Sequence, residues 1–325
     1  MATTLPSLTA LAALVFTWMS VQQNNQQLRI AEQGQITTRF NEAVSHLGSS
    51  SPDVRFGGIY ALERIMHDSA PDQPRVISVL SAFVRTWSQA PARRPAQQPG
   101  ATPHPPADVV AAITVLAARA VDRNRDGTAQ LDFAGADLRG LELRPGVSYT
   151  QRFSGKPYRP SEVNLSYADL DGADLRGAEL SYVELEEAWL TRANLSGAWL
   201  YVLGLRGAVL DGANLANVVL TRSSLYGASL KKANLKGANL HSTAIGAAYL
   251  DDADLSHAVL SDADLTDANL PGTNLQGSDV TVDQVISALP HSSTRLPEAL
   301  AKDPRVRRRI AEVEEGQLLP SPTTE

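Results

Sequence analysis

The sequence predicts a mainly β protein: a solenoid in the second half of the chain, preceded by an α-helical region. Two observations support this fold class. From Val163 to Val280 an aliphatic residue recurs at every fifth position, and it is Leu at all 24 of these centres except Ile245 and Val280. Before residue 121, by contrast, apolar residues recur at intervals of three and four, which is the spacing of amphipathic helices.

A period of five fits neither regular element of secondary structure. In a helix, successive centres would be rotated by about 140°, and in a strand they would alternate between the two faces. Ala168 and Leu170 show the recurring pair of apolar residues two positions apart, as on one face of a very short strand, and polar residues or glycine fill the positions between such pairs. A chain that turns a corner at every repeat buries all the centres.

The repeats resemble the pentapeptide-repeat family, as residues 168–172 (ADLDG), 193–197 (ANLSG) and 263–267 (ADLTD) show. This resemblance implies a right-handed quadrilateral β-helix with four repeats per coil, so that 24 repeats form six coils about 29 Å long. An offset run over 131–138 predicts an additional first coil. We therefore expect the β-helix over 131–280, with a loop inserted at 144–160.

The amino terminus contains the most apolar window of the chain, Leu5 to Val21, and no charged side chain precedes Arg29. Seventeen helical residues span about 26 Å, against a hydrocarbon core of about 30 Å, so residues 1–27 are predicted to form a membrane anchor helix. Basic residues follow this single span, and the positive-inside rule then places the repeat domain in the cytoplasm. A cleaved signal peptide and a buried soluble helix are the alternatives.

Residues 28–121 are predicted to form a helical region that contains a Pro-rich linker at 89–107. Helices are expected from 36 to 47, from 53 to 65, from Asp72 and from Asp108. The pair Gly57-Gly58 would weaken a helix unless it allows close helix contact. After the repeats, residues 281–325 are expected to form a helical cap and tail, with a covering helix from Val282 to Leu289 and another from Asp303.

The first 140 residues also resemble the helical region of membrane-associated pentapeptide-repeat proteins of actinobacteria. The segments that carry this resemblance are QLRIAEQGQITTRF (27–40), DVRFGGIYALERI (53–65) and RVISVLSAFVR (75–85). The resemblance supports the anchor and the two-part architecture, and it implies no established activity.

The composition argues against catalysis and against a cofactor or metal. The absence of cysteine excludes disulfides, thiolate zinc sites and cysteine nucleophiles, and the six histidines show no ligand or triad spacing. Asp122 to Gly127 matches the start of a calcium-binding loop, but its twelfth position is Phe133 instead of Glu. We therefore expect a non-enzymatic protein, with a polar helix exit at residues 122–127.

The formal charge of −6 is concentrated in residues 161–280, which contain seven basic and sixteen acidic groups. Some pentapeptide-repeat proteins mimic DNA and bind DNA gyrase, so a DNA mimic that binds this topoisomerase is the alternative function that the resemblance implies. Mimicry requires a continuous negative face, however, and here a basic belt separates two acidic clusters. Direct nucleic-acid binding is not expected either, because glutamates directly follow the arginines of 305–309. The belt comprises Arg192, Arg206, Arg222, Lys231, Lys232 and Lys236.

The favoured function is a membrane-anchored scaffold or adaptor that presents a rigid surface to an unidentified protein partner. If four repeats form a coil, residues twenty apart stack, and outward aromatic and valine side chains then form rows that suit docking. The alternative is that the helical region packs on one of these rows. The candidate docking residues are Trp189, Val209 and Tyr249 in one row and Trp199, Val219 and Val259 in another.

Overall fold

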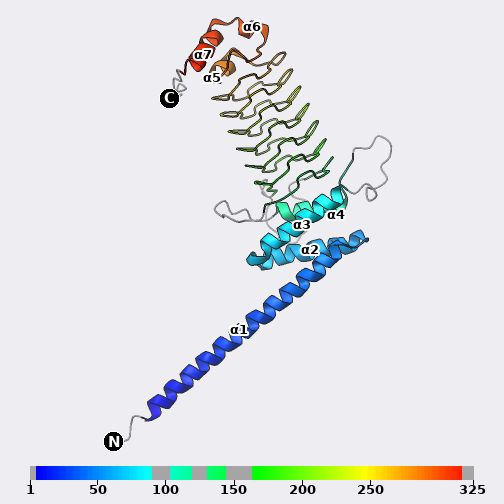
Figure 1. Cartoon of the computed structure of the whole chain (residues 1–325), viewed down its shortest axis with the longest axis vertical. Coiled ribbons are helices and arrows are strands. Elements are labelled where there is room, and N and C mark those ends of the chain that lie inside the picture. The colour runs from blue at the N-terminus through cyan, green and yellow to red at the C-terminus, as the bar shows by residue number, and fades with distance from the viewer. Residues whose placement is uncertain (1–4, 90–102, 119–129, 144–162, 317–325) are drawn as a thin grey trace. The chain divides into compact units, whose positions relative to one another are not determined.

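The computed structural model describes residues 5–89, 103–118, 130–143 and 163–316 (Figure 1). The side chains of residues 5–12 and 32 lie outside the described ones. The chain forms two compact units, Met1–Asp72 and Gln73–Glu325. Residues 90–102 of the expected linker at 89–107, the calcium-like loop at 122–127 and the loop inserted at 144–160 fall outside the described residues.

The first unit consists of helix α1 (Leu5–Leu47), helix α2 (Pro52–Asp68) and the short 3-10 helix η1 (Ala70–Asp72). The carboxyl end of α1 packs against α2, which buries Ile59, Leu62 and Ile65. A Cβ atom on Gly58 would lie 2.7 Å from the carbonyl oxygen of Ala43, so a glycine is needed at this crossing. The close helix contact expected from the glycine pair is therefore made by Gly58.

No helix among the residues that the structure describes is long and apolar enough to cross a membrane. The predicted span begins at Leu5, and the side chains of residues 5–12 are not among those described. The helix α1 itself continues without a break from this segment to Leu47.

The second unit begins with helices α3 (Gln73–Ser88) and α4 (Ala107–Ala117), which pack on each other. The apolar stripe of α3 is buried along its whole length, from Val76 to Trp87. Helix α4 buries Val109, Ile113 and Leu116, but its N-cap is Pro106, so Asp108 lies in the first turn instead of capping the helix.

Residues 131–143 and 163–280 form the predicted solenoid, in which parallel bridges join residues that are twenty positions apart, as between Trp189 and Val209. Because the repeat has five residues, each coil has four sides, and outward residues stack in four rows. The first coil is bridged differently: Asp132 pairs with Asp169, 37 positions on, and the additional residues lie in the undescribed segment 144–162. The centres and the small residues two positions before them line the core, as with Ala168 and Leu170.

A tight turn forms each corner. At Leu170 to Ala173 the amide of Ala173 donates to the carbonyl of Leu170 at 3.0 Å, and the third residue, Gly172, has a φ of 64°. A positive φ at this position is the mark of a type II turn. Residues other than glycine also occupy this position, among them Lys232 with a φ of 59°. The backbone pattern is therefore imposed by the stacked coils even where the local sequence does not favour it.

After the repeats come helices α5 (Val282–Ser287), α6 (Glu298–Ala301) and α7 (Pro304–Glu314). Thr281 and Gln284 form a capping box at the start of α5, and Asp303 caps α7 by accepting from the amide of Arg305. The covering helix expected over 282–289 and the helix expected from Asp303 are thus present, and α6 was not anticipated.

Candidate functional site

Two of the four outward rows carry large apolar side chains. In one, named the Trp189 row, parallel bridges join Trp189, Val209, Ser229 and Tyr249 in order. In the other, named the Trp199 row, the same bridges join Trp199, Val219, Asn239 and Val259. The structure therefore brings the six candidate docking residues together in the two rows that the twenty-residue register predicts.

The aromatic members of these rows are exposed. Trp189 exposes 51% of its surface, Trp199 62% and Tyr249 46%, whereas Val209 and Val219 are half-buried. Their main chains are held between neighbouring coils: the amide of Leu170 donates to the carbonyl of Trp189 at 2.7 Å, and that of Trp189 to the carbonyl of Ala168 at 2.9 Å. Such a backbone presents the side chains on a rigid support, which lowers the entropic cost of binding.

Two cations stand over aromatic rings beside the Trp189 row. The guanidinium carbon of Arg206 lies 5.2 Å from the ring centroid of Tyr226, and Nζ of Lys231 lies 5.3 Å from that of Tyr249. This grouping was not predicted from the sequence. The register could have revealed the first pair, because Arg206 and Tyr226 are twenty residues apart at the same corner.

A second aromatic pair lies at the corner that follows the Trp199 row. The rings of Tyr182 and Tyr201 meet edge to face, with their centroids 5.6 Å apart, and the guanidinium of Arg222 donates to the hydroxyl of Tyr201 at 3.2 Å. This corner therefore adds aromatic surface beside Trp199.

The remaining two rows are of different character. One stacks Asn194, Asn214 and Asn234 and continues to Asp254, and the amide of Asn214 donates to Oδ1 of Asn194 at 3.2 Å. The other consists mainly of small residues around Gly204. Neither offers an exposed aromatic side chain, so the docking candidates are confined to the Trp189 and Trp199 rows and their corners.

Asp254 in the asparagine row has a lowered pKa. Desolvation by burial raises the pKa, but hydrogen bonds from the side chain and backbone of Ser256 and from Asn274, with the charge of Lys236, outweigh it. Its Oδ1 accepts from the amide of Ser256 at 2.9 Å and from Nδ2 of Asn274 at 3.0 Å. The carboxylate thus acts as an acceptor in the ladder and is favoured in its ionised form.

The amino-terminal end of the solenoid is covered by α3, α4 and the residues that adjoin them. Arg85 of α3 pairs with Asp132, and Nε2 of Gln89 donates to the carbonyl of Gly135 at 2.7 Å. His104 Nδ1 lies 2.9 Å from the carbonyl oxygen of Gly140. Residues 103–106 of the expected linker thus adjoin the first coil. The helices α3 and α4 meet the edge of this coil instead of a lateral row, and Trp189 and Trp199 stay exposed.

The carboxyl-terminal end is covered by α5 and the segment that follows it. Nε2 of Gln284 donates to the carbonyl of Leu260 at 2.7 Å and to that of Ala263 at 2.9 Å. The amide of Leu289 donates to the carbonyl of Ala268 at 2.9 Å. Because segments of the chain pair with coil edges at both ends, the lateral rows are the faces of the solenoid that are open to a partner.

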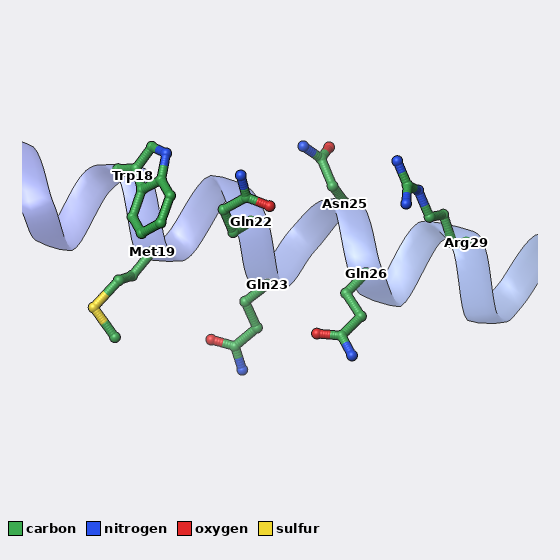
Figure 2. Close-up of a pocket in the computed structure, with 7 residues that line it drawn as sticks. All are labelled: Trp18, Met19, Gln22, Gln23, Asn25, Gln26 and Arg29. Carbon is green, nitrogen blue, oxygen red and sulfur yellow. The ribbon is translucent and has the colours of Figure 1, made fainter.

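Within the described ranges no group of His, Asp and Glu side chains is arranged to hold a metal ion. A shallow hollow beside α1 is lined by Trp18, Met19 and Arg29 together with four polar residues between them (Figure 2). All of its lining residues belong to this one helix, and no second element among the described residues lines it. The hollow therefore lacks the enclosure of a small-molecule site.

Comparison with known proteins identifies the repeats. The family model described as Pentapeptide repeats matches residues 161–197, 205–241 and 247–281. HetL, a pentapeptide repeat protein involved in heterocyst differentiation regulation in the cyanobacterium Nostoc sp. strain PCC 7120, is 32% identical over 51% of this chain and 73% of its own, with a TM-score of 0.32. No curated protein matches the chain.

Two further solved structures match the chain. The pentapeptide repeat protein alr5209 of Nostoc PCC 7120 is 42% identical over 28% of this chain and 72% of its own, with a TM-score of 0.24. QnrB1, a plasmid-mediated fluoroquinolone resistance protein, is 20% identical over 55% of this chain and 83% of its own, with a TM-score of 0.31. Because the family model matches the repeats and the chain is 32% identical to HetL and 42% identical to alr5209, the chain belongs to the pentapeptide-repeat family.

Proposed function

We propose that this protein is a non-catalytic scaffold or adaptor that presents its solenoid surface to a protein partner. The observation that carries this proposal is the presence of two rows with exposed aromatic side chains and outward valines on a solenoid whose two ends are covered. Aromatic side chains on a rigid support are the residues that dominate the binding energy of protein interfaces.

The membrane anchor over residues 5–21 is part of this proposal, as is kinship with the actinobacterial membrane-associated type. In α1, Leu14, Phe16 and Trp18 expose 68%, 74% and 63% of their surface. Large apolar side chains in such a group need a lipid or protein cover. With Arg29 and Arg39 behind the span, the repeats would face the cytoplasm, where the partner would be a membrane-proximal protein.

The DNA-mimic alternative requires a continuous acidic surface along the solenoid. In the Trp189 row, Asp169 is followed by Trp189 and Val209, and the adjoining corners carry Arg206 and Lys231. The negative charge is thus interrupted across the middle coils. For this reason we favour the scaffold.

Site-specific photo-crosslinking of the full-length protein in its own cells tests the scaffold. A photoreactive residue replaces Val209 in one variant, Val219 in a second and Asn214 in a third, so that three rows of a single coil are compared. We expect a protein adduct at Val209 or Val219 and none at Asn214. Adducts at none of the three positions, or equally at all three, would contradict the proposal.

Fractionation with a carbonate wash tests the anchor separately, with a variant that lacks residues 1–27 as the matched control. We expect the full chain in the membrane fraction and the shortened chain outside it. Recovery of both from the aqueous fraction would remove the anchor from the proposal and leave the scaffold to the crosslinking result.

A further inference from the structure

Six residues form a mixed aromatic and cationic surface on the middle coils, which we name the Trp189 patch: Trp189, Arg206, Val209, Tyr226, Lys231 and Tyr249. Trp189, Tyr226 and Tyr249 are exposed, and Val209 lies between the two exposed aromatics of its row. The patch therefore combines apolar anchors with positive charge on one side of the solenoid.

The cations of this patch have no carboxylate partner among the residues that the structure describes. Arg206 and Lys231 are held over tyrosine rings, a contact that keeps each cation near the surface and leaves its N–H donors for another group. Asp211 lies nearby, but its Oδ1 accepts from the hydroxyl of Ser229 at 2.5 Å and from the backbone amide of Lys231 at 3.1 Å. The positive charge of the patch is thus suited to a negative group from outside.

The positive charge is confined to a short length of the solenoid. One coil before Arg206 the same corner carries Glu186 and Glu187, and one coil after Lys231 its corner carries Asp251 and Asp252. A long polyanion such as a nucleic acid strand would have to run over these acids, which repel it. The occupant must therefore be short or carry its negative charge locally.

The size of the patch sets the length of the occupant. Trp189 and Tyr249 are three coils apart, which is about 14 Å at about 4.8 Å per stacked strand. An extended peptide covers this distance with about four to five residues at about 3.3 Å each.

We infer that the Trp189 patch binds a short acidic segment of a protein, whose carboxylates pair with Arg206 and Lys231 while its apolar side chains pack on Trp189 and Tyr249. This inference rests on the proposed scaffold function and specifies it, because it selects the Trp189 row over the Trp199 row and states the chemistry of the partner. Guanidinium and ammonium groups that already lie on aromatic rings meet carboxylates with little further loss of side-chain freedom.

Selection from a display library of random peptides about seven residues long, panned on the full-length protein, tests the inference. We expect the recovered peptides to be rich in Asp and Glu next to apolar residues, and to bind more weakly as salt is raised. Trp189→Ala should weaken them about 30-fold, as at a binding hot spot, and the double variant Arg206→Gln/Lys231→Gln about tenfold.

Two variants serve as controls. Trp199→Ala removes an exposed tryptophan from the other row, and Lys236→Gln removes an exposed cation of the basic belt at a different corner. Both should leave binding of the selected peptides unchanged. All variants alter outward side chains, so their far-ultraviolet circular dichroism should match that of the parent protein.

Several results would overturn the inference. One is a library that yields no binding peptides, only neutral or basic ones, or peptides that bind the double variant as tightly as the parent protein. Binding of a single-stranded oligothymidylate at the same residues would overturn it equally. The crosslinking experiment separates this failure from failure of the scaffold, because an adduct at Val219 without one at Val209 retains the scaffold and rejects the Trp189 patch. An adduct at Val209 on an acidic segment of the captured protein supports both.

Discussion

The backbone at Lys232 offers a direct test of how the stacked coils impose turn geometry. Lys232 has a φ of 59° and an exposed side chain at the third position of its turn. A side chain in this left-handed conformation costs roughly 1–2 kcal/mol, and glycine avoids that cost. Glycine in turn loses about 0.5–1 kcal/mol through the greater freedom of the unfolded chain. We therefore expect Lys232→Gly to stabilise the solenoid by about 0.5–1 kcal/mol.

The comparison with Lys232→Ala isolates the backbone contribution, because both variants remove the long charged side chain and only one retains Cβ. Gly172 supplies the reverse experiment at the same corner: its φ is 64°, and a Cβ atom at this position would point into open space, so Gly172→Ala should destabilise by a similar amount. Urea unfolding followed by circular dichroism measures all three variants. If Lys232→Gly proved less stable than Lys232→Ala, the turn geometry would not be a source of strain and the reasoning would be wrong.

Three further predictions concern the core, the asparagine row and the amino-terminal cover. Thr243 is buried and its hydroxyl donates to a backbone carbonyl of the preceding coil at 2.8 Å, so Thr243→Val should cost about 1 kcal/mol in urea unfolding while Thr243→Ser costs less. The pKa of Asp254 lies below its usual 3.8, so the carboxylate's contribution to stability is present above pH 3.8 and is lost as the pH falls through the lowered pKa. Asp254→Asn should therefore flatten this part of the dependence of the free energy of unfolding on pH. An unchanged profile would contradict the role of the carboxylate. A Cβ on Gly140 would overlap a backbone carbonyl of the segment entering α4, whereas one on Gly135 would meet only a side-chain amide 3.7 Å away. Gly140→Ala should therefore lower the free energy of unfolding by about 1 kcal/mol or more beyond the effect of Gly135→Ala, and a comparison of the two melting temperatures checks this.

Much of the solenoid could be predicted because its sequence obeys a single repeated requirement. Every fifth residue must fill the core, and the small residue two positions earlier must fit beside it, so positions such as Leu170 and Ala168 indicate the fold without any knowledge of the partners they meet. Once four repeats per coil are assumed, the register between Trp189 and Val209 follows by counting.

The cover of the amino-terminal end could not be predicted in the same way. Arg85 and Gln89 carry no periodic signal, and their contacts with Asp132 and Gly135 join segments that lie far apart in the sequence. The contact between Lys231 and Tyr249 is missed for a related reason: the residues are eighteen positions apart, so the pair crosses diagonally from a corner to a neighbouring row instead of following the register.

The same regularity explains where the function of this chain should be sought. Inward positions are fixed by packing and corner positions by turn geometry, whereas the outward positions of the Trp189 and Trp199 rows face solvent and are less constrained by packing. An exposed tryptophan at such a position, as at Trp189 or Trp199, contributes little to the fold and leaves apolar surface in water. Two such residues occur in rows that also contain valines and a tyrosine, and this grouping supports the proposed partner. Among the residues that the structure describes, the rows differ because Arg206 and Lys231 lie over tyrosine rings in and beside the Trp189 row, and this difference makes the choice of partner chemistry testable.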